Sequence, residues 1–390
     1  MAQHRRARVA VAALFGSNGA LFANLLPRYP EIKADLQLSN AVYGGAIAAF
    51  SAGALVAGLT AAALIRRYRS ARVAVVGTFG IAAFVVVAGL AAGPVMLAAA
   101  LFVAGASDAV TDVAQNAHGL RLQRAYGRSI INSFHAVWSA GAILGGSMGA
   151  AAIALDISRT VHLTTAALIF SAVVVIAYPH LLKGSDLDSR PAGRSTQGAG
   201  AGPAVYAALL ALVVIAVAGA VVEDAGSSWA TLYLRDVLGA PGAVAALGYV
   251  GMAGAMVVGR LIGDRLVDRL GERAVVRAGG FITAAGMGAA LAFPSILGTI
   301  AGFAAAGLGV ATLIPAAMHR ADQLPGLRPG SGLMVVTWLM RIGFFGAPLI
   351  VGVTADATTL RVGLVTVPVA GVVVFALAGV LSVRRWPARS

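Results

Sequence analysis

Long runs of apolar residues, separated by short polar segments, dominate the pattern of this chain. An α-helix needs about 20 mostly apolar residues to cross the roughly 30 Å hydrocarbon core of a bilayer, and it satisfies its own backbone hydrogen bonds, as lipid requires. Twelve runs have about this length, and they cover residues 8–26, 41–65, 73–92, 95–118, 130–154, 161–182, 204–232, 243–266, 274–293, 296–318, 331–355 and 361–383. The pattern predicts an all-α membrane protein with twelve transmembrane helices.

One polar segment divides these spans into two sets of six. Residues 183–203 are rich in Gly, Ser, Pro and charged side chains, a composition typical of a solvated linker. We therefore expect an N-terminal six-helix bundle over 1–182, a cytoplasmic linker over 183–203 and a C-terminal six-helix bundle over 204–390. A weak repeat, in which Gly58–Val75 aligns with Gly259–Val276 at an offset of 201 residues, favours duplication. Paired halves are typical of secondary transporters, whose substrate site lies between them.

Composition excludes several other classes of protein. Hydrophobic residues make up 59% of the chain and charged residues 11%, far from the balance of a soluble domain, and there is no cysteine for disulfides, thiolate metal sites or a nucleophile. No His and carboxylate set has metal-ligand spacing, and no Ser, His and Asp grouping indicates nucleophilic catalysis. We therefore expect no metal, no organic cofactor and no enzymatic activity.

The basic residues indicate orientation in the membrane rather than a nucleic-acid partner. The formal net charge is +14, but Lys and Arg lie in short clusters between apolar runs and not on one face of a soluble fold. If both termini are cytoplasmic, 22 of the 29 basic residues fall on the cytoplasmic side, 5 on the other side and 2 within spans. We expect a multi-pass monomer in the cytoplasmic membrane, with the lipid bilayer and a small-molecule substrate as its partners.

Two short segments resemble features of the major facilitator superfamily. Pro30–Ser39 resembles the short outer helix that follows the first span in that superfamily, and Gly263–Arg273 resembles its cytoplasmic motif between helices two and three, here in the second-half copy. In the first-half copy, Arg67 stands where an Asp is expected. The resemblance covers nearly the full length. It implies two pseudo-symmetric six-helix bundles, and a gating loop that contains Asp268 and Arg269.

Two further motifs are similar to the branch that contains fucose permease and its uncharacterised bacterial inner-membrane relatives. Asp112 and Asn116 resemble its acid-x-x-x-Asn signature, and Glu223 with Trp229 six residues later resembles a second motif in the seventh span. Fucose permease also has an essential acid in its first helix. Here that helix offers only Asn18 and Asn24, so the resemblance does not extend to that acid.

Ionisable residues inside the spans are the main functional candidates, and they are Asp108, Asp112, Glu223, Asp224, Arg260 and Arg341. A charge at the bilayer centre costs about 2.5–3.5 kcal/mol on insertion scales, so each residue needs a reason to be there. Asp108, Asp112 and Asn116 are spaced i, i+4, i+8 and share one helix face, which we expect to line the cavity. We predict that Asp112, Glu223 and Asp108 carry protons; a permanent salt bridge is the alternative. Asp224 projects about 100° away from Glu223, and the sequence assigns it no role.

Polar and aromatic residues of the spans are expected to complete the substrate site, and they are Asn116, Asn18, Asn24, His135, Trp138, Arg341, Trp229 and Trp338. Arg341 lies near mid-membrane, where it either neutralises Asp112 or Glu223, which we favour, or binds an anionic group of the substrate. His135 is alternatively a packing residue, and Trp229 an interfacial anchor. Arg260, close to Asp264, is expected to be structural.

Together these features predict a secondary transporter, driven by the proton gradient, that moves a small polar solute such as a sugar by alternating access. Proton-driven efflux of drugs or natural products is the first alternative, because the Ala, Val and Leu lining also suits amphipathic molecules. A membrane sensor that binds a ligand without transporting it is the second.

Overall fold

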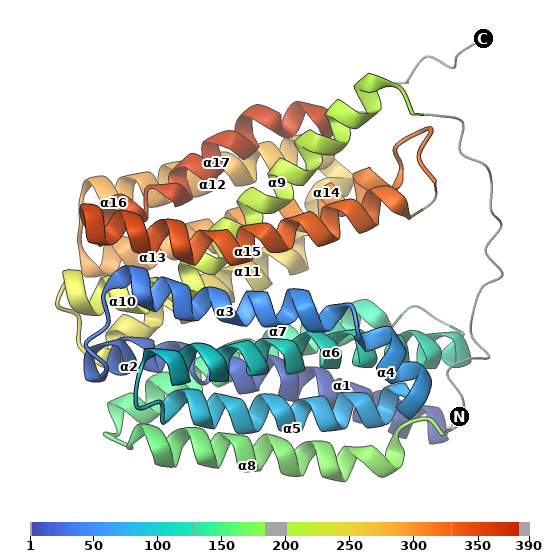
Figure 1. Cartoon of the computed structure of the whole chain (residues 1–390). Helices are drawn as coiled ribbons and strands as arrows, with labels where there is room; N and C mark the ends of the chain where they lie inside the picture. The colour runs from blue at the N-terminus through green and yellow to red at the C-terminus, as the bar shows by residue number, and fades with distance from the viewer. Residues whose placement is uncertain (1, 128–129, 184–200, 329, 382–390) are drawn as a thin grey trace. The chain divides into compact units, whose positions relative to one another are not determined.

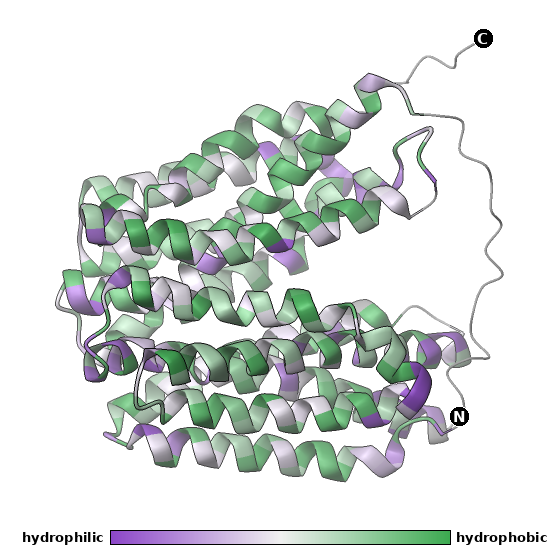
Figure 2. Ribbon diagram, viewed as in Figure 1, coloured by the Kyte–Doolittle hydropathy of each residue, from purple (hydrophilic) through white to green (hydrophobic). Residues whose placement is uncertain are grey.

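The computed structural model describes residues 2–127, 130–183, 201–328 and 330–381, so most of the predicted linker lies outside the described residues. Within those ranges every regular element is helical, and twelve spans are long and apolar enough to cross a membrane. They overlap the twelve predicted spans one for one. Figure 2 shows apolar residues along the lengths of these helices and hydrophilic residues collected near their ends.

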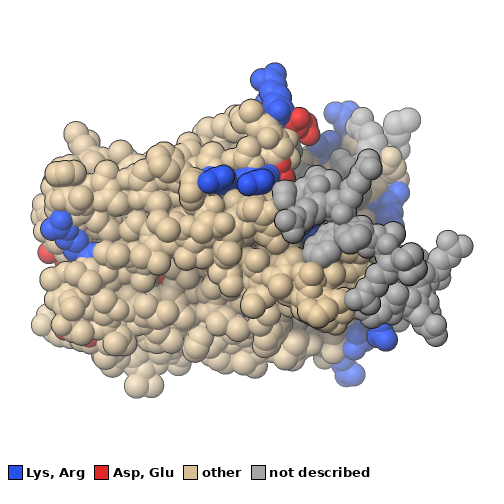
Figure 3. Space-filling view, turned by 90° about the horizontal axis from the view of Figure 1, so that it is seen from above, with Lys and Arg blue, Asp and Glu red and all other residues tan. Residues whose placement is uncertain are grey.

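The surface of the molecule suits contact with lipid. Large side chains such as Leu168, Ile176 and Val95 are exposed, and the face seen in Figure 3 has broad areas without a charged residue. A soluble protein does not expose apolar surface on this scale. The chain is therefore a multi-pass membrane protein, as the hydropathy pattern predicts.

The contacts divide the chain into two compact units, residues 1–192 with 231–250 (unit 1) and residues 193–230 with 251–390 (unit 2). Unit 1 holds α1 (Ala2–Ala23), η1 (Leu26–Arg28), α2 (Tyr29–Asp35), α3 (Asn40–Gly58), α4 (Ala61–Tyr68), α5 (Ser70–Gly89), α6 (Pro94–Tyr126), α7 (Ile131–Ala154), α8 (Arg159–Ala177), η2 (Tyr178–His180), most of α10 (Ala230–Leu232), the π-helix η4 (Tyr233–Val237) and the start of α11 (Gly242–Leu270). Unit 2 holds α9 (Pro203–Ser228), the rest of α11, α12 (Glu272–Ala292), α13 (Ile296–Val310), α14 (Leu313–Asp322), α15 (Ser331–Ala357), α16 (Leu360–Gly363), α17 (Thr366–Leu377) and η5 (Ala378–Leu381).

The second predicted span, 41–65, is divided between α3 and α4, and two further spans break next to a proline. The tenth consists of α13 and α14, and the last of α16, α17 and η5. Proline lacks a backbone N–H, and its ring clashes with the carbonyl four residues earlier. Pro315 and Pro368 lie four residues after Ala311 and Leu364, where the two breaks occur. Both breaks therefore follow directly from proline positions.

The seventh span is shorter than its apolar run. The prediction extends to residue 232, but α9 ends at Ser228 and a separate short helix begins at Ala230. Ser227 Oγ donates to the carbonyl oxygens of Glu223 and Asp224, both at 3.1 Å. Such back-bonding competes with the helical ladder, which accounts for the early end.

Glycines bring the backbones of unit 1 into direct contact. A Cβ atom on Gly141 would collide with the carbonyl of Gly16, and one on Gly145 would collide with the carbonyl of Ala20. These contacts join α1 to α7, which lie side by side (Figure 1). Small residues permit such close helix approach where lipid gives helices no hydrophobic reason to associate. The glycine spacing in the fifth span therefore serves packing.

Glycines also permit close helix packing in unit 2, where α12 packs against both α13 and α17. A Cβ atom on Gly279 would collide with the carbonyl of Gly309 in α13. One on its neighbour Gly280 would lie 2.7 Å from the carbonyl oxygen of Gly371 in α17. Two adjacent glycines thus serve two different helix contacts.

An unusual turn recurs in the two units. Arg69 alone separates α4 from α5, with φ 72° and ψ 147°, and Gly271 alone separates α11 from α12, with φ 82° and ψ 152°. The two turns lie 202 residues apart, so the alignment of Gly58–Val75 with Gly259–Val276 is displaced by one residue at this point. Almost all residues in this backbone region are glycine, because a Cβ atom is strained there.

Arg69→Gly is expected to stabilise the protein. The strain at a non-glycine residue here is about 1–3 kcal/mol, and the flexibility that glycine adds to the unfolded chain offsets up to about 1 kcal/mol of the gain. Thermal unfolding of the detergent-solubilised protein should show a higher midpoint. Arg67→Gly removes the same charge from the last turn of α4, where glycine is a poorer helix former than arginine, and should lower the midpoint instead. Equal shifts in the two variants would show that charge, not strain, decides the effect.

Candidate functional site

The acids of the fourth span lie on one face of a continuous helix. Asp108, Asp112 and Asn116 follow one another at successive turns of α6, and all three are half-buried. The Asn116 side-chain amide donates to Asp112 Oδ1 and to the Asp112 carbonyl oxygen, both at 2.9 Å. The Asp112 carboxylate is thus held by a neutral donor from its own helix.

Asn18 of α1 connects the Asp108 carboxylate to an indole of α7. Its Nδ2 donates to Asp108 Oδ1 at 2.9 Å, and its Oδ1 accepts from Trp138 Nε1 at 2.6 Å. These two bonds fix the orientation of the amide, because only its nitrogen can donate and only its oxygen can accept. Three helices therefore meet at one buried asparagine.

His135, one turn before Trp138 on α7, makes the corresponding connection to Asp112. Its Nε2 lies 3.0 Å from Asn116 Oδ1. An amide oxygen only accepts, so His135 Nε2 carries a hydrogen. The edge of Phe15 from α1 lies against the imidazole, with ring centroids 5.3 Å apart.

We call this set the polar layer, and its members are Asn18, Asp108, Asp112, Asn116, His135 and Trp138. It contains two carboxylates one helical turn apart, and each accepts a hydrogen bond from an asparagine amide. The oxygen of each amide in turn accepts from a ring N–H of α7. An ionised carboxylate only accepts hydrogen bonds, whereas a protonated one also donates. Uptake of a proton therefore changes what the polar layer can offer to a hydroxyl group of a solute.

Asn24 lies outside the polar layer, although the sequence prediction includes it in the substrate site. Its side chain is 0% exposed; Oδ1 is 2.8 Å from His162 Nε2, and Nδ2 donates to the Ala20 carbonyl oxygen at 2.8 Å. In this conformation a solute does not reach it, because its surface and its hydrogen-bonding capacity are taken up by the protein.

Sequence reasoning missed the buried network to which Asn24 belongs. Arg28 is predicted to lie in an external loop, but it is 4% exposed. Its Nε donates to His162 Nδ1 at 3.4 Å, its Nη1 contacts Glu31 Oε2 at 3.0 Å, and its Nη2 donates to the Ile157 carbonyl oxygen at 2.6 Å. Because His162 Nδ1 accepts here, its Nε2 carries the hydrogen that it donates to Asn24. The available signal was His162 itself, a polar side chain within an apolar run that needs a partner.

In unit 2 the more deeply buried acid is Asp224, not Glu223. Asp224 is 6% exposed, and its Oδ1 accepts from Ser228 Oγ at 3.1 Å. Its Oδ2 has no hydrogen-bond partner among the described residues. Glu223, one position earlier on α9, is half-buried. Trp229 follows the end of α9 and is fully buried, so it has no surface for stacking on a solute in this conformation.

The predicted residues of α15 lie one turn apart. Trp338 is 51% exposed, and Arg341 is half-buried. Within the described part of unit 2, no ion pair joins Arg341 to Glu223, so that predicted neutralisation is not formed in this structure.

The segment predicted as a gating loop is helical. Asp268 and Arg269 are exposed in the last turn of α11, and the chain first turns at Gly271 because of its left-handed backbone.

Comparison with known proteins agrees with this architecture. The uncharacterized transporter y4wD of Sinorhizobium fredii is 30% identical over 95% of this chain and 97% of its own length. Membrane protein MosC of Rhizobium meliloti is 29% identical over 94% of this chain and 88% of its own.

Solved structures of transporters have the same fold. The nucleoside transporter NupG superposes with a TM-score of 0.76 at 12% identity, covering 98% of this chain and 100% of its own. A bacterial homologue of the human lysosomal transporter Spinster, inward-facing and unoccupied, superposes with a TM-score of 0.76 at 15% identity, covering 99% of each chain. The predicted two-bundle, twelve-helix fold is therefore confirmed.

The family assignment rests on sequence. The profile of the Major Facilitator Superfamily matches residues 11–348, most of the chain. With these relatives and neighbours, it confirms the prediction of a transporter and not an enzyme, and the chain belongs to the Major Facilitator Superfamily.

Proposed function

We propose that this transporter moves a small polar solute, such as a sugar, together with protons, and that the polar layer is where the two meet. The supporting observation is the pair of carboxylates inside one span, Asp108 and Asp112, each bonded to a neutral amide. Acids at membrane depth are costly and mark proton relays or substrate pathways. Asp112 and Asp108 are the proton acceptors of unit 1, and Glu223 is that of unit 2.

The neighbours of these acids suit a solute rich in hydroxyl groups. The Asn116 amide and the His135 imidazole both donate and accept, and Trp138 adds an aromatic ring for the apolar face of a sugar. The buried Asn18 holds Asp108 and Trp138 in position. A nucleoside also carries a sugar, and a nucleoside transporter shares this fold. The fold alone does not select between these solutes, so both belong in the test. The fucose permease-like branch also stays a prediction.

We also propose that the protein lies in the cytoplasmic membrane with both termini in the cytoplasm. The sparse basic residues of the opposite side support this, because three of them are tied within the protein: Arg28 and Arg159 form ion pairs with Glu31 and Asp35, and Arg361 donates to the Leu291 carbonyl oxygen at 2.6 Å. These few anchored arginines contrast with the larger number of Lys and Arg residues counted on the other side, and that asymmetry sets topology. Since the chain has no cysteine, single cysteines at either terminus can test this by labelling from one side.

The test is transport in proteoliposomes that contain a pH-sensitive dye. Sugars, nucleosides, amino acids and cationic drugs are added in turn without an imposed proton gradient. We expect one class of neutral polar solute to carry protons with it and to change the internal pH. Solute flux without a pH change would overturn the coupling. Binding without flux would support a sensor, and proton movement driven only by drugs would support efflux.

A further inference from the structure

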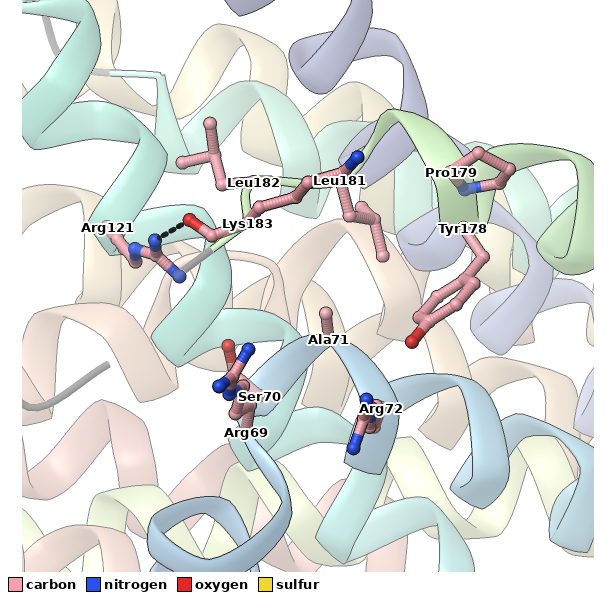
Figure 4. Close-up of a pocket in the computed structure, with 10 residues that line it drawn as sticks. All are labelled: Arg69, Ser70, Ala71, Arg72, Arg121, Tyr178, Pro179, Leu181, Leu182 and Lys183. Atoms are coloured by element: carbon pink, nitrogen blue, oxygen red, sulfur yellow. Dashed lines mark hydrogen bonds between the residues drawn. The ribbon is translucent and has the colours of Figure 1, made fainter. Parts of the chain in front are cut away.

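A basic pocket of unit 1 is not used by the proposed transport chemistry. It is a cavity of about 270 Å³ where the start of α5, the last turns of α6 and the segment after α8 come together (Figure 4). Its lining consists of Arg69, Ser70, Ala71, Arg72, Arg121, Tyr178, Pro179, Leu181, Leu182 and Lys183. Four of these ten residues are Arg or Lys, and none is acidic. The pocket therefore attracts anions.

One histidine ties the walls of this basic pocket together. His118 of α6 lies 2.9 Å from Ser70 Oγ through Nδ1, and its Nε2 accepts from the Leu182 backbone N–H at 3.2 Å. Ser70 and His118 are both fully buried. In the same way, the Arg121 guanidinium donates to the Lys183 carbonyl oxygen across the rim, as the dashed line in Figure 4 shows. These hydrogen bonds hold the backbone segments that carry the cationic side chains in place before an anion binds. Less conformational entropy is therefore lost when the anion binds.

The basic pocket lies at the depth of lipid headgroups. Ser70 begins one membrane span and His180 ends another, so the cavity is at the border of the hydrocarbon region. Its lining changes from cations to apolar side chains, including Leu182 and the 40% exposed Tyr178. A small anion would contact only the cationic side chains of the pocket. A lipid would also place an acyl chain beside its apolar side chains. Basic pockets between spans at this level suit anionic phospholipids.

We infer that the basic pocket binds the phosphate group of an anionic phospholipid, held by Arg72, Arg121, Lys183 and Arg69. Arginine pairs with phosphate oxygens through two parallel N–H groups, which suits a phosphodiester. Bound there, the lipid joins the start of α5 to the end of α8 and stabilises unit 1. Free inorganic phosphate and the lipid headgroup both present an anionic phosphate to these cations. Only the lipid also has acyl chains, and this difference distinguishes the two ligands.

The test titrates the full-length protein in detergent with dioleoylphosphatidylglycerol, dioleoylphosphatidylcholine or sodium phosphate, and counts bound molecules by native mass spectrometry. Wild-type protein is expected to retain phosphatidylglycerol in preference to the zwitterionic lipid. Arg72→Gln with Lys183→Gln should weaken this binding about tenfold or more, given the contribution of each cation near anionic lipid. Both side chains are exposed, and melting without lipid checks that the variant is folded.

The matched control is Arg66→Gln with Arg67→Gln, two exposed arginines of α4 that do not line the basic pocket. It removes the same charge and should leave phosphatidylglycerol binding within about twofold of wild type. Equal loss in both double variants would overturn the site, because the attraction would then be general. Sodium phosphate that binds as tightly as the lipid, with the same dependence on Arg72 and Lys183, would overturn the lipid as its occupant.

Discussion

Asp112→Asn is expected to abolish proton coupling while leaving solute binding in place. The asparagine retains an oxygen at the position that accepts from Asn116 Nδ2, so the 2.9 Å hydrogen bond can persist. An amide, however, does not take up a proton in this pH range. The pH change driven by solute in proteoliposomes should fall at least about tenfold. Exchange of labelled for unlabelled solute, which requires no net proton movement, should continue.

Asp156→Asn is the matched control for this experiment, because it removes the same charge from an exposed position between two spans of unit 1. Its coupling should equal that of the wild type. Asp108→Asn and Glu223→Gln, measured in the same assay, show whether these acids share the proton. Full coupling in all three variants of the proposed acceptors would refute the proton-carrying role of the acids.

Arg28→Met is expected to destabilise the protein severely. The guanidinium is buried, and its three nitrogens serve three separate acceptors: Glu31, His162 and the Ile157 carbonyl. Methionine fills a similar volume but leaves the buried His162 Nδ1 and the partly buried Ile157 carbonyl without their donor, whereas the 35% exposed Glu31 can contact solvent. The loss of free energy of unfolding should be about 2–4 kcal/mol, because each buried acceptor left unsatisfied costs about 1–3 kcal/mol. Thermal unfolding in detergent, followed by far-ultraviolet circular dichroism, measures the change.

The same end of unit 1 offers a control in Arg159→Met. Arg159 Nη1 lies 2.8 Å from Asp35 Oδ2, but the Asp35 side chain is 56% exposed. An exposed pair of this kind contributes less than about 1 kcal/mol, so the midpoint should shift little. Arg28→Lys should not restore stability, because one ammonium group cannot reach three acceptors arranged as a fork. Equal losses for Arg28→Met and Arg159→Met would contradict the role assigned to burial.

The sequence predicts the helices of this protein well because a bilayer imposes one local requirement on every span. Apolar length alone locates the twelve spans, and the breaks in the tenth and the last span follow from Pro315 and Pro368 once the missing N–H groups are considered. The face shared by Asp108 and Asp112 is also local, since it depends only on helical periodicity. Each of these features can be read within one segment of chain.

The partners of buried polar groups could not be read in that way. Asn24 meets His162 across 138 positions of sequence, and Arg28 meets His162 across 134. Arg28 follows a proline, and a charged residue in that position suggests an exposed loop. Only the tertiary fold shows that hydrogen-bond acceptors surround its guanidinium. The sequence repeat also misses the equivalence of the turns at Arg69 and Gly271 by one residue. Similar residue types recur at an offset of 201, whereas the turns share a backbone conformation that residue type alone does not reveal.

The backbone contact between α1 and α7 bears on how the polar layer behaves when the transporter changes conformation. Gly141 and Gly145 lie against the backbone carbonyls of Gly16 and Ala20, so α1 and α7 are in close contact at two successive turns. Asn18 and Trp138 lie on these two helices and share a hydrogen bond, so we expect them to move together in the proposed transport cycle. We then expect any change of water access at Asp108 during the proposed cycle to come from displacement of other helices around this pair.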